Sequence, residues 1–313
     1  MVWAWKVQDL VSAGADMHIL EATWHAKIND KFGGDLDKIR VCARYIEHCL
    51  QALGVEVEKI HFQKAEELMD DLGYWETFIN IAKNVTLARV KRAMSIMGRK
   101  VDEAESDYSK TLYPCIQVAD IIYSGFKLCL GGTDQRRAHI LARELAPKFG
   151  LDWKPIGIHT PLLIGLEGFS RMEVRGEEED AMMDAKMSKS KPQTAIFIHD
   201  TPNEIRKKIG AAFCPPKQVE YNPVMEINRL LLFSRDNFTL HVEREEKFGG
   251  PVDFTSFDEL KSAYSSGDLH PLDLKTATAE ALIDLFGNVR RHFEKNNEAH
   301  ELLEILKKAV VTR

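Results

Sequence analysis

The sequence predicts an α/β protein in which a parallel-sheet domain is followed by a mostly α-helical domain. Strand-like apolar runs alternate with amphipathic helical patterns over the first two-thirds of the 313 residues, an order typical of parallel sheets. From residue 194 onward helical patterns dominate. Gly131 and Gly132 lie where one expected strand turns into a helix, and ligands of parallel sheets bind at such turns.

The composition is that of a globular chain, because a hydrophobic content of 44% can fill one sizeable core and a smaller second one. No apolar run approaches the roughly 18 residues that cross a bilayer, so no membrane protein is expected. The net charge of −6 argues weakly against a general nucleic-acid coat, although a few basic groups can still hold phosphates. The cysteines have no C-x-x-C spacing, which argues against disulfides or a zinc site and predicts a cytoplasmic protein: Cys42, Cys49, Cys115, Cys129 and Cys214.

The strands expected in the first part of the chain alternate with helical patterns. Asp35 precedes the first helix, whose apolar residues keep helical spacing up to Leu53. A longer helical stretch runs from about 64 to 100. The strands are expected, in chain order, at the start of 17–28, in 57–63, at the start of 126–146 and in 154–166.

The second part of the chain begins with a short strand-like run at 194–200. A helix start follows, with Thr201 as N-cap, Pro202 at the first helical position and Glu204 closing a capping box. The acidic segment 171–185 before this part is only weakly periodic, which predicts a solvated insertion.

One helical segment carries polar groups at regular spacing. Tyr113, Gln117 and Asp120 fall at i, i+4 and i+7, so a phenol, an amide and a carboxylate share one helix face. A solvent-facing stripe and a ligand-binding face are equally good interpretations of this spacing. Gln135, just after the glycine turn, adds a fourth group at the mouth of the sheet, and together the four could hold a small polar ligand.

Five blocks of the sequence occur in the order found in one enzyme family. The chain resembles the tyrosyl-tRNA synthetases of the archaeal and eukaryotic type, which are class I aminoacyl-tRNA synthetases, and the resemblance covers nearly the whole chain. The blocks are YPCIQVADI at 113–121, GGTDQRRAHILARE at 131–144, KMSKS at 186–190, EKFGG at 246–250 and LHPLDLK at 269–275.

The resemblance implies a fold and its parts. It implies a Rossmann-like catalytic domain over 1–193 and a helical anticodon-binding domain over 194–313. Within the first, about 64–112 is implied to be an inserted helical region at which the family forms homodimers, and 171–190 to be the KMSKS loop with its acidic insertion.

The resemblance also implies a reaction, the activation of L-tyrosine by ATP and its transfer to tRNA(Tyr). The tyrosine carboxylate is already ionised and attacks the α-phosphate, so catalysis depends on positioning and charge stabilisation. Lys186 and Lys189 are the implied catalytic pair, closing over the phosphates of an ATP that carries Mg²⁺. The implied ATP-binding residues are Lys186, Met187, Ser188, Lys189 and Ser190, whereas Lys191 lies outside the motif.

The tyrosine and tRNA contacts carry over in the same way. Asp120 is implied to accept a hydrogen bond from the substrate phenol, and His25 matches a histidine of the family's DLHAYLN block, in which Thr23 and Trp24 here replace Asp and Leu. For His25 alone, a structural histidine satisfied by its neighbours is an equally good interpretation. The implied tyrosine-binding residues are Tyr113, Gln117, Asp120, Gln135 and His25; the acceptor-stem residues are Arg92 and Arg136; and the anticodon residues are Phe248, His270 and Asp273.

One family motif does not occur in the 313 residues, the His-x-Gly-His that binds ATP after the first strand. We expect from this that the protein carries further N-terminal residues with that strand. The alternative is a catalytically impaired relative that binds tRNA without making an adenylate. A tryptophanyl relative is a third hypothesis, but a carboxylate at Asp120 suits a phenol better than an indole.

Overall fold

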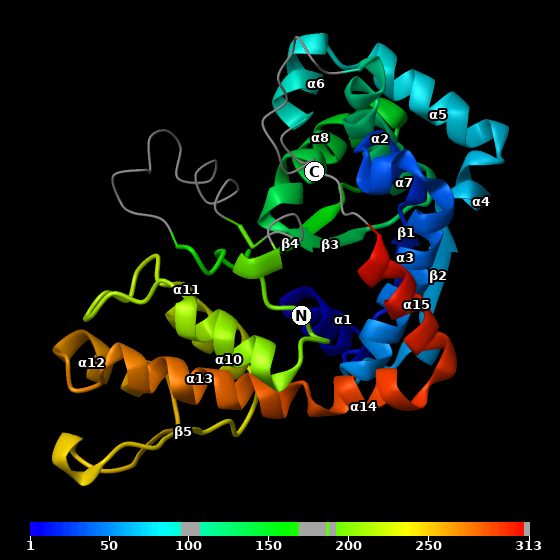
Figure 1. Cartoon of the computed structure of the whole chain (residues 1–313). Helices are drawn as coiled ribbons and strands as arrows, with labels where there is room; N and C mark the ends of the chain where they lie inside the picture. The colour runs from blue at the N-terminus through cyan, green and yellow to red at the C-terminus, as the bar shows by residue number, and fades with distance from the viewer. Residues whose placement is uncertain (95–106, 169–185, 188–191, 310–313) are drawn as a thin grey trace. The chain divides into compact units, whose positions relative to one another are not determined.

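The computed structural model describes residues 1–94, 107–168, 186–187 and 192–309, which form two compact units. The sheet unit comprises Trp3–Pro161 and the last helix from Glu298, and the helical unit comprises Met1–Val2 and Leu162–Asn297. Figure 1 shows the elements of each unit along the chain. No helix among the described residues is long and apolar enough to cross a membrane.

The strands of the sheet unit form two parallel pairs. β1 (Met17–Glu21) pairs with β2 (Ile60–Lys64), and β3 (Leu128–Gly132) pairs with β4 (Ile156–Thr160). Parallel pairing is therefore confirmed, but one continuous sheet is not, because no hydrogen-bonded strand joins the two pairs within the described residues.

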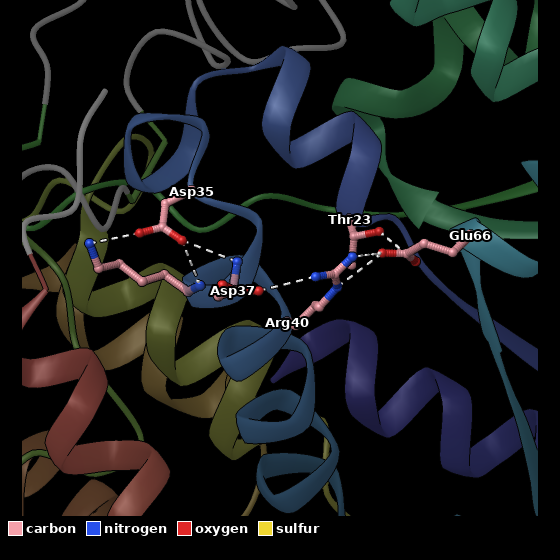
Figure 2. Close-up of polar contacts among 6 residues, drawn as sticks. Thr23, Asp35, Asp37, Arg40 and Glu66 are labelled. Carbon is pink, nitrogen blue, oxygen red and sulfur yellow. Dashed lines mark hydrogen bonds and ion pairs between the residues drawn. The ribbon is translucent and has the colours of Figure 1, made fainter.

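The helices of this unit cover the strands and form its core. The Asp35 N-cap is confirmed, since its carboxylate accepts hydrogen bonds from the backbone N–H groups of Asp37 and Lys38 (Figure 2). One buried apolar cluster joins α5, α6, α7 and α8, and a second joins α1 to β2 and the end of α3. The helices are α1 (Val2–Ser12), α2 (Thr23–Ile28), α3 (Leu36–Ala52), α4 (Ala65–Met69), α5 (Leu72–Lys83), α6 (Leu87–Ala93), α7 (Tyr113–Tyr123), α8 (Arg136–Leu145) and α15 (Asn297–Lys308).

The helical stretch predicted from about 64 to 100 is divided into α4, α5 and α6 as far as residue 94. Asp71 caps α5 by accepting a hydrogen bond from the N–H of Gly73 at 2.6 Å, and Thr86 caps α6 through the N–H of Arg89 at 3.3 Å. In a continuous helix these N–H groups would bond to carbonyls of the preceding turn. Here the capping side chains accept their hydrogen bonds instead, so a new helix begins at each cap.

The helical unit contains mainly helices and one short antiparallel hairpin. The predicted capping box is confirmed, because Thr201 and Glu204 each accept a hydrogen bond from the other's backbone N–H. The strand expected at 194–200 is absent. Instead, the carboxylate of Asp200 accepts a hydrogen bond from the N–H of Phe197 at 2.8 Å and closes a turn there. The elements are α10 (Pro202–Ala211), α11 (Pro223–Ile227), a π-helical turn (Asn228–Leu232), β5 (Leu240–Val242), β6 (Val252–Phe254), α12 (Phe257–Ser266), α13 (Pro271–Leu285) and α14 (Gly287–Lys295).

Candidate active site

The polar face of α7 points into the sheet unit. Tyr113, Gln117 and Asp120 all belong to this helix, as the spacing predicts. Asp120 is only 5% exposed, and the other two side chains are half-buried. The interpretation as a solvent-facing stripe is therefore wrong, and the face is available to a ligand or to internal partners.

Both oxygens of the Asp120 carboxylate have close neighbours. The hydroxyl of Tyr74, on α5, donates a hydrogen bond to Oδ1 at 2.8 Å. The Nε2 atom of His25, on α2, lies 3.0 Å from Oδ2. Burial and the Asp120 charge raise the pKa of Tyr74 far above its usual value, so this phenol stays a proton donor. The sequence did not single out Tyr74, because its helical pattern is that of an ordinary core residue.

The ring of His25 is buried against Tyr113 and Asp120. The residue is 3% exposed, and its ring meets the Tyr113 ring edge-on at a centroid distance of 5.1 Å. Neither ring nitrogen makes a hydrogen bond with a described residue, because the contact with Asp120 lacks hydrogen-bond geometry. Buried polar atoms rarely stay unpaired, so the ring can accept or donate a hydrogen bond to a bound molecule.

A polar network holds α2 in place. The Thr23 hydroxyl donates to Glu66 at 3.0 Å, and the Arg40 guanidinium donates to the other oxygen of Glu66 and to Asp37 (Figure 2). Glu66 therefore links α4 to both α2 and α3. Because Thr23 is 2% exposed and lies two residues before His25, this network fixes the start of the helix that carries the histidine.

The glutamine pair lies beside this face. Gln117 donates from Nε2 to Oε1 of Gln135 at 3.0 Å, while its own Oε1 is buried without a hydrogen-bond partner among the described residues. Gly131, at the end of β3, makes the approach possible, because a Cβ there would lie only 3.1 Å from the Cβ of Gln135. The four predicted groups of the pocket thus lie on two adjoining elements, α7 and the turn after β3.

Tyr113 completes this set as a neutral phenol. Burial, reinforced by the charges of Asp120 and Asp134, raises its pKa to about 12. It can therefore donate a hydrogen bond at any physiological pH. One carboxylate, two amides and a phenol form a site suited to a small molecule with a hydroxyl and an amine.

The two acceptor-stem candidates lie on neighbouring helices. Arg92 is in the last turn of α6, and Arg136 is the first residue of α8. Both side chains are exposed. The helices are joined by an ion pair in which Arg89 contacts Glu144 at 3.1 Å, so α6 and α8 present the two arginines from a common support.

Only the first two residues of the lysine motif, Lys186 and Met187, are among the described residues, and they lie in the helical unit. Lys186 forms an antiparallel bridge with Ile164, and the N–H of Met187 donates to the carbonyl of Leu163 at 2.7 Å. The Met187 sulfur accepts a hydrogen bond from the N–H of Ile196 at 3.4 Å. The remaining motif residues, Ser188, Lys189 and Ser190, lie outside the described part of the chain, as does the acidic insertion.

The anticodon candidates lie near a shared arginine. Phe248 is 59% exposed in the turn between β5 and β6, and His270 caps α13 by accepting the N–H of Leu272 at 3.1 Å. Asp273 is in the first turn of the same helix. Arg244, which no sequence pattern indicated, donates to the carbonyls of Gly250 at 2.6 Å and Asp268 at 2.8 Å. It ties the Phe248 turn to the segment before His270.

Comparison with known proteins identifies the class to which this fold and site belong. The model of the family described as tRNA synthetases class I (W and Y) matches residues 1–174 and 179–287. The chain belongs to this family and is therefore a class I aminoacyl-tRNA synthetase.

The individual relatives are more specific. A tyrosine–tRNA ligase from Aeropyrum pernix is 54% identical over 93% of this chain and 80% of the relative, and one from Sulfurisphaera tokodaii is 52% identical over 99% and 85%. A tyrosyl-tRNA synthetase from Pyrococcus horikoshii, solved with L-tyrosine, is 43% identical with a TM-score of 0.89 over 97% of this chain and 86% of that one. The Rossmann-like α/β fold with a helical domain is thereby confirmed.

Proposed function

We propose that this chain is a tyrosine–tRNA ligase that makes tyrosyl-adenylate from L-tyrosine and ATP and transfers the tyrosine to tRNA(Tyr). The observation that carries the proposal is the buried Asp120 carboxylate, which accepts a hydrogen bond from Tyr74 and lies beside the ring of His25, whose nitrogens make no hydrogen bond with a described residue. A buried carboxylate favours tyrosine, whose phenol hydroxyl can donate a hydrogen bond to it, over phenylalanine, which has only a hydrogen atom at that position. Relatives named as tyrosine–tRNA ligases support the same substrate.

In this proposal the pocket positions tyrosine from both ends. Asp120 accepts the substrate phenol, and His25 supports that end of the ring. Tyr113, Gln117 and Gln135 bind the amino end. The substrate carboxylate is then free to attack the α-phosphate without a general base, and the rate comes from holding the reacting atoms in line.

The departing pyrophosphate needs positive charge. We assign this role to Lys186 and Lys189, with Met187, Ser188 and Ser190 shaping the segment that meets ATP. Ammonium groups that tighten on the β- and γ-phosphates as charge develops stabilise the transition state more than bound ATP. Mg²⁺ enters with ATP, since this ion is usually held by substrate phosphates and water.

Transfer RNA is the second substrate, and we assign its contacts to two surfaces. Arg92 and Arg136 recognise the acceptor stem, and the exposed Phe248 stacks on an anticodon base while His270 and Asp273 contact base edges. The boundary between the catalytic and anticodon-binding domains falls at residues 193 and 194. The cytoplasm, where protein synthesis takes place, is the proposed location.

We also propose a homodimer formed by the helical region of about 64–112. Leu72, Trp75 and Ile79 share one face of α5, and Leu87 begins α6. Their exposed fractions are 83%, 38%, 55% and 60%, which is unusual for four large apolar side chains so close in the chain. A second copy of the chain would cover them.

Tyrosine-dependent ATP–pyrophosphate exchange tests the catalytic proposal. Asp120→Ala should relax the selection of tyrosine over phenylalanine. A site built for a hydroxyl rejects the analogue by roughly 10⁴- to 10⁵-fold, the range known for a tyrosyl-tRNA synthetase. Selectivity that is unchanged in Asp120→Ala would remove this residue from the pocket.

The same assay separates the enzyme from a tRNA-binding relative without activity. Such a protein would bind tRNA(Tyr) but show no exchange with any amino acid. For the enzyme, Phe248→Ala should lower kcat/KM for tRNA in aminoacylation, because the lost base stacking corresponds to about 1 to 3 kcal/mol of binding free energy. Pyrophosphate exchange in the absence of tRNA should be unchanged. A parallel loss of exchange would indicate a folding defect instead.

A further inference from the structure

Three side chains with metal-ligating atoms gather at the amino ends of β1 and β2. They are Asp16, His18 and His61, all exposed, and one ligand atom from each lies within 4.8 Å of the other two. His18 and His61 are direct partners in the parallel register of the two strands. Because side chains alternate along a strand, this register brings both rings out on the same face, where they stack at 4.7 Å.

The carboxylate of Asp16 lies between the two rings. Its Oδ2 is 3.5 Å from Nε2 of His18, and its Oδ1 is 3.3 Å from Nε2 of His61. Two ligands bonded to Zn²⁺ at about 2.0 to 2.2 Å in tetrahedral geometry lie about 3.3 to 3.5 Å apart. Each carboxylate oxygen therefore lies at such a separation from one imidazole nitrogen. Bringing both nitrogens to the same separation from a single oxygen, and from each other, needs side-chain rotation, which is open to all three residues because they are exposed.

We propose that Asp16, His18 and His61 bind a divalent transition-metal ion, with Zn²⁺ as the expected occupant and water in the fourth position. Two imidazoles and one carboxylate are ligands that Zn²⁺ favours, whereas Ca²⁺ and Mg²⁺ prefer oxygen ligands alone. The competing interpretation is a carboxylate that only pairs with two histidines.

The position of this site separates it from tyrosine activation. A strand rises about 3.3 Å per residue, so His18 is about 10 Å from Glu21, at the carboxyl end of β1 that leads into the helix of His25. The His18 ring also contacts Phe126, just before β3, at a centroid distance of 5.2 Å. A metal ion here would fasten β1 to β2 beside that segment, which is a structural role.

The test is titration of chelator-treated protein with ZnCl₂ in a calorimeter. The unmodified chain should bind one Zn²⁺ at this site. His18→Ala and His61→Ala should each weaken Zn²⁺ binding by about 10- to 100-fold or more, because removing a residue that only hydrogen-bonds to a metal ligand already costs that much. His241→Ala is the matched control, because His241 is also an exposed histidine between two carboxylates, those of Glu243 and Asp253. It should bind Zn²⁺ as the unmodified chain does.

A second measurement guards against misfolded variants. Zn²⁺ should raise the thermal midpoint of the unmodified chain and of His241→Ala, but not that of His61→Ala. The proposal would be overturned if His18→Ala and His61→Ala both bound Zn²⁺ as tightly as the unmodified chain, or if the unmodified chain bound none. Tyrosine-dependent exchange should be unaffected by His61→Ala, so the outcome is independent of the proposed enzymatic function.

Discussion

At the scale of single residues, Asp120 is the group whose surroundings matter most for the proposed specificity. A lone buried carboxylate is costly, and the Tyr74 hydroxyl offsets part of this cost while fixing the carboxylate plane. With Oδ1 engaged by Tyr74, Oδ2 is the oxygen that faces His25 and remains for a substrate phenol. Tyr74 thus acts on the substrate through Asp120, as a positioning residue.

Tyr74→Phe should therefore lower the discrimination between tyrosine and phenylalanine without removing the carboxylate. The loss of one charge-assisted hydrogen bond corresponds to about 1.5 to 3 kcal/mol, so kcat/KM for tyrosine should fall by roughly 10- to 100-fold, while the much lower value for phenylalanine changes little. Pyrophosphate exchange with both amino acids measures the ratio.

Tyr123→Phe is the control for this substitution. Tyr123 packs edge-on against Tyr74 at 5.6 Å, and its hydroxyl also bonds a carboxylate, that of Asp71. The same chemical change one ring away should leave the tyrosine-to-phenylalanine ratio intact. Equal effects of the two substitutions would show that Tyr74 supports the fold rather than the specificity of Asp120.

These residues also show which parts of the site were predictable. Tyr113, Gln117 and Asp120 were found because helical spacing is local and can be read from eight consecutive positions. Tyr74 and Arg244 were not found. Tyr74 bonds to Asp120, which is distant in the sequence, and Arg244 bonds to backbone carbonyls, which no sequence pattern marks. His25 was left between two interpretations because only tertiary packing reveals that its nitrogens make no hydrogen bond within the part of the chain that the structure describes.

At the scale of elements, β1 and α3 meet through two carboxyl groups. Glu21, the last residue of β1, is hydrogen-bonded to Glu47 of α3. Burial, followed by this hydrogen bond and the charge of Glu47, raises the pKa of Glu21 from 4.5 to about 7. Glu21 therefore keeps its proton up to near-neutral pH, and the contact between strand and helix is favoured while it does.

The raised pKa predicts how stability changes with pH. The folded chain holds the Glu21 proton more tightly than the unfolded chain, so this contribution is full below pH 4.5 and is lost as the pH rises through 7. Glu21→Gln keeps a donor toward Glu47 and cannot ionise. At pH 8 it should raise the free energy of unfolding by about 1 kcal/mol, a value reduced for the partial exposure of the group.

Urea unfolding at several pH values measures this effect. The free energy of unfolding of the unmodified chain should decline more steeply between pH 4.5 and 7 than that of Glu21→Gln. Glu304→Gln is the control, because Glu304 lies on α15 in an exposed ion pair with Lys307 at 3.0 Å, which lowers its pKa. That variant should gain no stability at pH 8. Identical pH profiles for the unmodified chain and Glu21→Gln would contradict the raised pKa of Glu21.

At the scale of the whole molecule, the class of fold was predictable but the extent of its sheet was not. Apolar strands followed by amphipathic helices predict parallel pairs wherever they occur, and both pairs formed. Whether pairs join depends on which strands are neighbours, and periodicity carries no information on that. The hairpin of β5 and β6 was missed because its strands have only three residues each, too few for a pattern.

The exposed apolar face of α5 is the feature that bears on assembly. Ile79→Lys combined with Leu72→Lys places two ammonium groups in the proposed contact between copies, where their burial would be strongly unfavourable. We expect the unmodified chain to be a dimer and this variant a monomer in light scattering at micromolar concentration. Ile305→Lys is the control, since Ile305 is 46% exposed on α15 of the same unit, and it should remain dimeric. A monomeric unmodified chain would contradict the homodimer, and a dimeric double variant would move the interface away from α5.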